Sequence, residues 1–116
     1  MRVIKPSRVP EFAKSHRDAE KLLLAWLKIV QRENWESIAQ LRTIFPKADG
    51  VKAARGKIVT VFNIGGNKYR LITAVHYNRI RVFILRFLTH PEYDKEKWKA
   101  DLWAQSPTST RLSITN

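Results

Sequence analysis

The side chains best suited to chemistry gather where an apolar run ends and a charged one begins, in RFLTHPEYDKEKW from Arg86 to Trp98. His90 can take up or release a proton, since histidine titrates near neutrality. Tyr93 can donate a hydrogen bond or stack on an unpaired base. Because His90 and Tyr93 are three residues apart, one helical turn would place them on a common face. The pair is therefore a candidate for acid and base chemistry.

The same stretch also fits the start of a helix without any chemistry. Thr89 can be the N-cap of a capping box that Glu92 closes, or His90 can be the N-cap ahead of Pro91 at the first helical position. A histidine at a helix start is more often a surface or capping residue than a catalyst. The catalytic interpretation needs cations nearby, and Arg70 and Arg86 are the candidates.

Charge predicts an anionic partner. The 116 residues include 22 Lys and Arg against 10 Asp and Glu, a formal net charge of +12. No acidic residue stands between Asp49 and Glu92. A phosphate backbone selects for such a surface, because each neutralised phosphate releases counterions. The alternative is a basic surface that aids solubility or meets an acidic protein. The cations of the acid-free window are Lys52, Arg55, Lys57, Lys68, Arg70, Arg79, Arg81 and Arg86.

Helices are predicted for the first part of the chain. Apolar residues recur at three and four positions in HRDAEKLLLAWLKIVQREN, which indicates an amphipathic helix. A shorter helix is expected before it, around 9–14. A third is expected to open at Asn34 as N-cap and to stop before Pro46. The segment PKADGVKAARG that comes next, with its small and basic residues, predicts a loop.

From Lys57 the apolar period changes to two, which predicts three strands in KIVTVFNI, NKYRLITAVHY and RIRVFILRFL. Gly65 and Gly66 suit a tight hairpin between the first two strands. A phosphate-binding P-loop is disfavoured at these glycines, because such a loop is followed by a helix and none is predicted here. Alternation puts Lys68 and Arg70 on one face. Whether Arg86 shares that face depends on the length of the next connection, so the register stays open.

Several classes of protein are disfavoured. Cysteine is absent, so disulfides and thiolate metal sites are excluded, and the three histidines are too scattered to suggest a metal. No apolar run approaches the twenty or so residues of a membrane span, and no secretory leader is recognisable, so a cytoplasmic protein without a cofactor is expected. Residues 1–104 are predicted to form one domain, and the polar segment 105–116 a flexible tail.

Two elements in order, VFNIGGNKYRLI from Val61 to Ile72 and FLTHPEYDK after an arginine-rich strand, resemble the HigB toxins of bacterial toxin-antitoxin systems, within the RelE-like superfamily. NWESIAQLRTIFPKADGV also resembles the helix and loop that lead into the sheet of that family. The likeness extends from about residue 1 to residue 98. It implies an α+β fold, with N-terminal helices on an antiparallel sheet of about three to four strands and a short C-terminal helix.

The resemblance also implies a function. It suggests a metal-independent endoribonuclease that cleaves mRNA, usually in the ribosomal A site, and that is neutralised by a HigA-like helix-turn-helix antitoxin, with DNA contacted only through that antitoxin. Such cleavage uses the RNA 2′-hydroxyl as nucleophile and needs a base, an acid and cations around the phosphorus. The residues available are His90 and Tyr93 for proton transfer and Arg70 for the phosphate. The cations and amide expected to hold the RNA backbone are Lys57, Lys68, Arg86 and Asn67.

Which group is base and which is acid is left open by the sequence. Two other functions also fit. A ParE-type gyrase inhibitor would share the fold without needing His90 and Tyr93, and a non-catalytic RNA-binding module would need only the cations.

Overall fold

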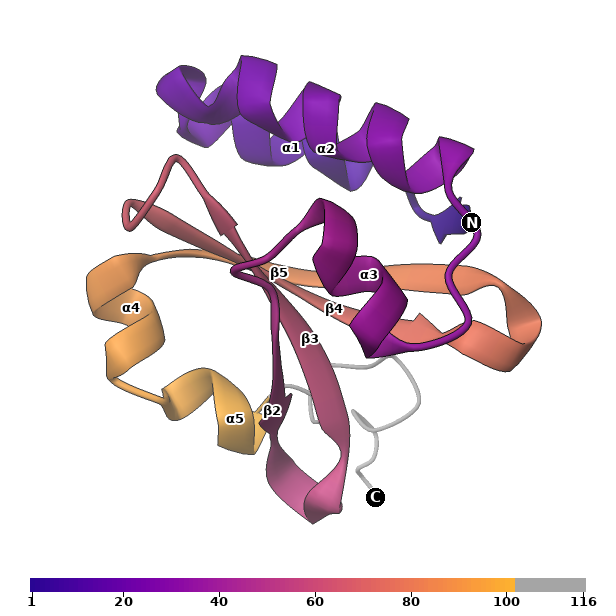
Figure 1. The fold of residues 1–116 in the computed structure, drawn as a ribbon. Helices are drawn as coiled ribbons and strands as arrows, with labels where there is room; N and C mark the ends of the chain where they lie inside the picture. Colours follow the sequence, from indigo (N-terminus) through magenta and orange to yellow (C-terminus); the bar gives the residue numbers. More distant parts are fainter. Residues whose placement is uncertain (102–116) are drawn as a thin grey trace, which may run out of the picture.

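The long helices come before the three long strands along the chain, as the change of apolar period predicts (Figure 1). The computed structural model describes residues 1–101, so the predicted tail and its boundary lie outside the described residues. The α-helices are α1 (Arg8–Ser15), α2 (Glu20–Arg32), α3 (Ile38–Ile44), α4 (His90–Asp94) and α5 (Lys97–Asp101). The strands are β1 (Arg2–Ile4), β2 (Asp49–Lys52), β3 (Ile58–Ile64), β4 (Tyr69–His76) and β5 (Arg81–Thr89). Three 3₁₀ turns are η1 (Arg17–Ala19), η2 (Ala54–Gly56) and η3 (Tyr77–Arg79).

The α+β class and the short C-terminal helix are confirmed, but the sheet is larger than expected. It has five strands in the order β1-β5-β4-β3-β2, and β1 runs parallel to β5 while the other pairs are antiparallel. The two additional strands carry little signal of their own. β1 has three residues, and β2 lies in the small-residue segment predicted as a loop, where pairing with β3 keeps it extended.

One face of the sheet packs against α1, α2 and α3. The apolar stripe predicted for α2 is confirmed, because Leu23, Trp26 and Val30 are buried there. The third helix begins later than predicted. Its N-cap is Ser37, whose side chain accepts a hydrogen bond from the backbone N–H of Gln40, and not Asn34. A serine that reaches the first free amides of the helix satisfies them directly, which fixes the start at that residue.

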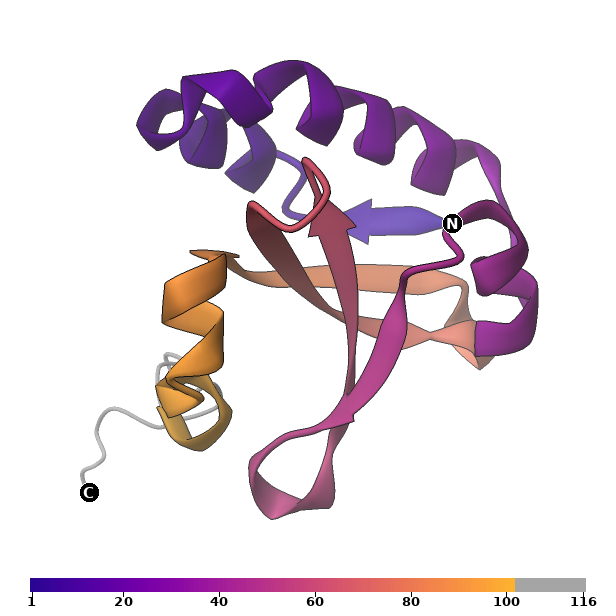
Figure 2. The same cartoon turned by 60° about the vertical axis from the view of Figure 1, so that its left-hand side comes forward.

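The opposite face of the sheet carries a second, smaller core under α4 and α5. Figure 2 shows these two helices (orange) apart from α1 and α2 (indigo), with the sheet between them. Trp98 of α5 is 4% exposed and packs with buried residues of this face, including Val61 and Ile72. Helices therefore cover both faces of the sheet near the β5–α4 junction. This packing fixes the position of the residues that come after β5.

The β3–β4 connection confirms the predicted hairpin. Gly65 and Gly66 have φ angles of +70° and +67°, which glycine adopts without the penalty of a Cβ. The backbone N–H of Lys68 donates to the carbonyl of Gly65 at 3.2 Å and closes the turn. The turn stands beside the end of β5, since the N–H of His90 donates to the Lys68 carbonyl at 3.0 Å.

Candidate active site

The β5–α4 junction is a complete capping box. The Thr89 hydroxyl accepts from the backbone N–H of Glu92 at 3.3 Å, and a Glu92 carboxylate oxygen accepts from the Thr89 N–H at 2.8 Å. That backbone hydrogen bond holds the pKa of Glu92 below its ordinary value. Of the two predicted caps, Thr89 is the N-cap and His90 is the first helical residue. The box sets the direction in which α4 leaves the sheet, and with it the place of His90 and Tyr93.

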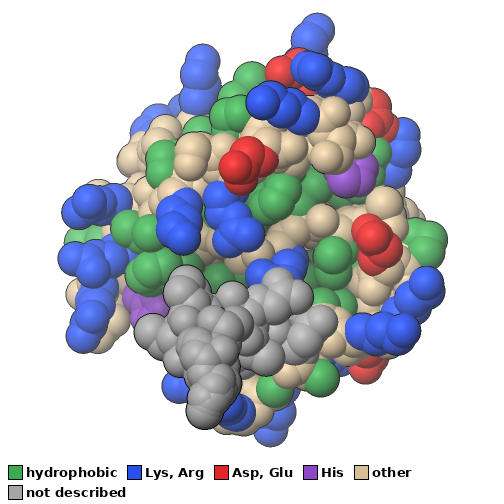
Figure 3. All heavy atoms as spheres, turned by 180° about the vertical axis from the view of Figure 1, so that it is seen from behind, with side chains coloured by type: hydrophobic (Ala, Val, Ile, Leu, Met, Phe, Trp, Pro, Cys, Tyr) green, Lys and Arg blue, Asp and Glu red, His purple; other side chains and the backbone are tan. Residues whose placement is uncertain are grey.

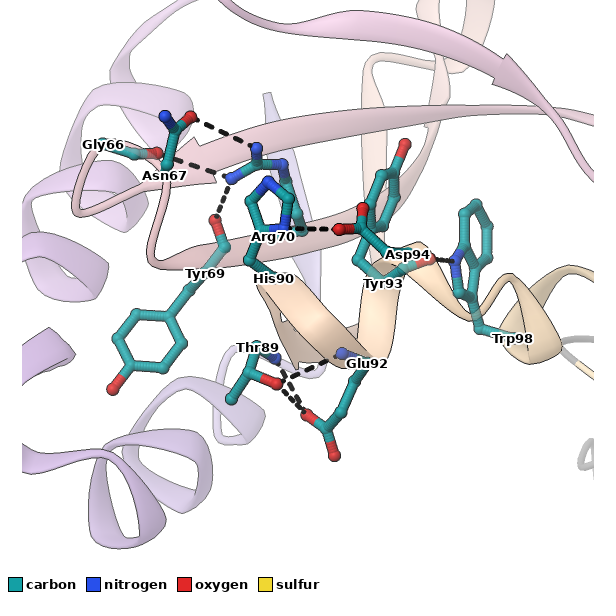
Figure 4. A network of polar contacts seen from close by, with 10 residues as sticks. All are labelled: Gly66, Asn67, Tyr69, Arg70, Thr89, His90, Glu92, Tyr93, Asp94 and Trp98. Atoms are coloured by element: carbon teal, nitrogen blue, oxygen red, sulfur yellow. Dashed lines mark hydrogen bonds and ion pairs between the residues drawn. The ribbon is translucent and has the colours of Figure 1, made fainter.

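Arg70 is a buried cation, with only 9% of its surface exposed. Its guanidinium donates to the carbonyls of Tyr69 at 3.1 Å and Gly66 at 3.5 Å, and to the Oδ1 of Asn67 at 3.4 Å. Figure 4 shows these three acceptors on one side of the group. All three are neutral, and within residues 1–101 no carboxylate pairs with Arg70. Because a buried charge normally has a counter-ion, this one is suited to an incoming anion.

Tyr93 stands between Arg70 and Trp98. The Cζ of Arg70 is 5.7 Å from the ring centroid of Tyr93, and the ring of Trp98 stacks on Tyr93 with centroids 5.3 Å apart. The Trp98 indole N–H also donates to the Tyr93 carbonyl at 3.1 Å. Burial raises the pKa of the Tyr93 hydroxyl, so the group remains protonated at neutral pH and can donate but not accept a proton.

His90 is paired with a residue that the sequence analysis did not assign to the site. Its Nδ1 lies 2.7 Å from the Oδ2 of Asp94, four positions further along α4 (Figure 4). A carboxylate on Nδ1 favours the tautomer that carries a proton there and leaves Nε2 free to act as a base. The spacing of four between His90 and Asp94 was a usable signal, because such residues are neighbours on a helix. The sequence analysis also did not assign Trp98 to the site. Its role in holding Tyr93 is seen only in the structure, where it is buried against that ring.

A β-bulge decides whether Arg86 shares the face of Arg70. The connection between β4 and β5 has four residues, since His76 pairs with Arg81. If the pairing continued without a shift, this even number would place Arg86 on the sheet face opposite that of Arg70. The register then shifts: Thr73 pairs with Ile84, but Ile72 pairs with Arg86, which leaves one extra residue in β5. Arg70 and Arg86 consequently share a face.

Helix α1 supports this bulge. The guanidinium of Arg8 donates to the carbonyl of Ile84, next to the extra residue, at 3.0 Å. The Arg86 guanidinium donates to the Leu85 carbonyl at 2.8 Å. Contacts from both sides thus hold the backbone at the point where the register changes.

The remaining predicted RNA-binding residues do not all join Arg70. Asn67 does, through its hydrogen bond to the guanidinium. The expectation that Lys68 shares the face of Arg70 is wrong, because Lys68 precedes β4 in the turn and forms an ion pair with Asp18. Lys57 is exposed and precedes β3, at the end of that strand remote from the β3–β4 turn. Seven residues of strand, or about 20 Å, separate Lys57 from the turn.

Asp18 organises the helix-facing side of the same turn. Its carboxylate accepts from the hydroxyl of Tyr69 at 2.7 Å as well as from the ammonium of Lys68. These hydrogen bonds, first that of Lys68 and then that of Tyr69, lower the pKa of Asp18, and the bond to Asp18 raises the pKa of Lys68. The turn is therefore tied to η1 on one side of the sheet while Arg70 reaches toward Tyr93 on the other.

Neither a metal centre nor a membrane span is found in the described part of the chain. Within residues 1–101 no three His, Cys, Asp or Glu side chains are grouped as a metal site requires. No helix in that range is long and apolar enough to cross a bilayer.

Comparison with known proteins places the chain in a class. The class is that of the RelE-like toxic components of toxin-antitoxin systems, since the model of the HigB toxin family with that description matches residues 19–96. The chain belongs to this family, and its membership implies an antitoxin partner. Similar curated proteins are "mRNA interferase HigB" of Escherichia coli O6:H1 and "mRNA interferase toxin HigB" of Escherichia coli K12. The first is 27% identical over 95 residues, 82% of this chain and 90% of the relative, and the second is 26% identical over 94 residues, 81% and 88%.

Proposed function

We propose that this chain is an mRNA interferase, a toxin that cleaves messenger RNA without a metal. The observation that carries the proposal is Arg70: a buried guanidinium without a carboxylate partner in residues 1–101, held beside Tyr93. A fork of N–H donors fits two non-bridging phosphate oxygens. Two relatives of similar length carry the name mRNA interferase, which agrees with this proposal.

The reaction is an attack of the RNA 2′-oxygen on the adjacent phosphorus. His90 takes the 2′-hydroxyl proton on Nε2, and Asp94 on Nδ1 stabilises the imidazolium that forms. The new P–O2′ bond forms as the P–O5′ bond breaks, which yields a 2′,3′-cyclic phosphate and a 5′-hydroxyl. Arg70 stabilises the charge that builds on the phosphorane oxygens.

Tyr93 assists as a donor. Its raised pKa, caused by burial, keeps the hydroxyl protonated, so it can hydrogen-bond the departing 5′-oxygen and cannot replace His90 as base. On this proposal His90 is the base and Tyr93 the hydrogen-bond donor. Imidazolium at His90 can supply the proton that the 5′-oxygen finally needs.

The RNA reaches the site across a basic surface. Figure 3 shows Lys and Arg side chains spread over the face opposite the view of Figure 1, with apolar side chains among them. Arg86 and Asn67 hold the backbone near the scissile phosphate. We further propose that the substrate is mRNA on the ribosome, that a HigA-like helix-turn-helix antitoxin neutralises the toxin, and that both encounters take place in the cytoplasm.

The test is cleavage of end-labelled mRNA by the purified protein, with and without programmed ribosomes, in buffer containing EDTA. Fragments that end in a cyclic phosphate and require ribosomes are the expected result. Salt-dependent RNA binding without fragments would establish a binding module instead. Absence of RNA cleavage together with gyrase-dependent DNA breaks would establish a ParE-type toxin.

A further inference from the structure

The apolar face of the sheet continues beyond the part that α5 covers. Trp98 of α5 packs with Val59 and Ile72, which belong to the smaller core on that side (Figure 2). Because side chains alternate along a strand, Ala74 stands on the same face as Ile72. A groove of about 450 Å³ opens there. Its lining includes Lys57, Ala74, Phe83 and Leu85.

The floor of the groove is apolar. Phe83 pairs with Ala74 across β4 and β5, so the two side chains stand on the same face. Phe83 and Leu85 are only half-buried, which leaves apolar surface in contact with solvent. Lys57 also lines the groove and is exposed, so it adds a positive charge. An aromatic ring matches this combination, because it packs on apolar carbon and attracts a cation to its face.

Helix α5 ends close to this groove. It contacts η2, and Lys57, the next residue after η2, lines the groove. A helix of five residues is only about 7.5 Å long, so Asp101, where the described chain ends, lies near the groove. The residues that follow in the sequence are Leu102, Trp103 and Ala104. They are apolar and include an aromatic ring of the kind that the groove suits.

We propose that residues 102–104 dock in this groove, with the indole of Trp103 on Phe83. Attachment to α5 gives this segment an effective concentration in the millimolar range, which a free partner rarely reaches. A second copy of the chain is disfavoured as the occupant, because two molecules that each carry a net charge of +12 repel one another. A phosphate backbone is matched less well, because the floor of the groove is apolar.

Docking fixes α5 and, through it, Tyr93. From Lys97 to Ala100 only Trp98 is buried, and a helix this short does not persist without tertiary contacts. The indole of Trp98 stacks on the Tyr93 ring and donates to the Tyr93 carbonyl. A second anchor after Asp101 therefore keeps Trp98 in place. The consequence for catalysis rests on the proposed function, whereas the docking itself does not.

The test is a double-mutant cycle on the full-length chain, in which thermal unfolding is measured for the wild type, Trp103→Ala, Phe83→Ala and the double variant. Trp103→Ala should lower the unfolding temperature of the wild type by about 4 °C or more. In the Phe83→Ala background the same change should have much less effect, since its partner is already gone. In the control background Leu24→Ala, which alters an exposed leucine of α2, it should keep its full effect. Additive effects of Trp103→Ala and Phe83→Ala would overturn the docking.

Cross-linking keeps the proposal falsifiable if Phe83→Ala does not fold. The chain has no cysteine, so Ala74→Cys and Ala104→Cys together supply its only two thiols. A short bismaleimide should join these thiols within one chain. It should not join Ala104→Cys to Leu24→Cys, because α2 lies on the other side of the sheet. Absence of the link within one chain, or links only between two chains as a second copy would give, would overturn the proposal.

RNA cleavage tests the consequence for Tyr93 separately. Trp103→Ala should lower kcat more than it raises KM, because Arg70 still binds the phosphate while Tyr93 loses support. Unchanged kcat in a variant with a lowered unfolding temperature would overturn this consequence and leave the docking standing. A wild type that cleaves no RNA would overturn the proposed function itself, on which neither the cycle nor the cross-link depends.

Discussion

The guanidinium of Arg70 lies over the ring of Tyr93, with 5.7 Å between Cζ and the ring centroid. The contact joins the middle of the sheet to the helix that begins after β5. It also places a fixed cation beside a phenol that stays protonated, as phosphoryl chemistry requires. Neither residue depends on a flexible loop for its position, because the strand holds one and the capping box of α4 holds the other.

Replacement of Arg70 should impair catalysis more than folding. We expect Arg70→Ala to lose at least about 2 kcal/mol of transition-state stabilisation, or roughly thirtyfold in kcat/KM, as when an oxyanion donor is lost. Arg70→Lys should restore only part of the rate, because an ammonium cannot bind two phosphate oxygens as a fork. Single-turnover cleavage rates measure both effects. Arg79→Ala, an exposed arginine in η3, is the matched control, and an equal loss in that variant would refute a specific role for Arg70.

Removal of the Tyr93 hydroxyl separates its chemistry from its packing. Tyr93→Phe keeps the stack on Trp98 and should lower the cleavage rate at least about tenfold at constant substrate affinity. Because the pKa of Tyr93 is raised by burial, its stability contribution is present below the unfolded value of 10.0 and is lost as pH rises through the higher folded value. The thermal unfolding temperature should therefore decrease more steeply between about pH 9 and about pH 12 in the wild type than in Tyr93→Phe. If the unfolding temperatures of the two proteins changed with pH in parallel, the Tyr93 hydroxyl would not be buried in the folded protein.

The capping box at the start of α4 should contribute measurably to the free energy of unfolding. Thr89→Ala removes the hydroxyl that accepts from the Glu92 N–H and should cost about 1 kcal/mol of unfolding free energy. Because α4 then loses its fixed start, cleavage should also fall even though Thr89 touches no substrate. Thr89→Ser is the control and should restore both properties. Denaturant unfolding with unchanged midpoints in all three proteins would contradict the assigned cap.

Acid should release the β3–β4 turn from η1. The pKa of Asp18 is lowered by Lys68 and Tyr69, so this contribution to stability is present above the ordinary value of 3.8 and is lost as pH falls through the folded value. Asp18→Asn should consequently unfold at a lower temperature than the wild type at neutral pH, and the difference should diminish as the pH falls below the ordinary value of 3.8. A difference that persists undiminished in acid would show that something other than this carboxylate is responsible.

Local sequence patterns were enough to predict much of this molecule. The stripe of α2, the three long strands and the capping box at Thr89 each arise from neighbouring residues, and the structure confirms them. The family membership drawn from NIGGNKYR and THPEYDK is also confirmed. These features depend on interactions within a few positions, which is what a single sequence displays.

The features that were missed depend on contacts between distant segments. Strand β2 exists because β3 pairs with it, and Lys68 turns away from Arg70 because Asp18, far earlier in the chain, attracts it. The shared face of Arg70 and Arg86 depends on one extra residue in β5. A strand pattern of period two cannot reveal such an insertion, since the adjacent apolar residues Ile84 and Leu85 pack into the cores on opposite faces of the sheet.

The central claim is that His90 is the base in RNA cleavage. It is tested most directly by the rate at which His90→Ala cleaves end-labelled mRNA on programmed ribosomes, beside the wild type and the control His76→Ala, which alters a histidine at the far end of β4. The account predicts loss of cleavage in His90→Ala with unchanged thermal unfolding and antitoxin binding, and full activity in His76→Ala. Cleavage by His90→Ala at the wild-type rate would contradict it.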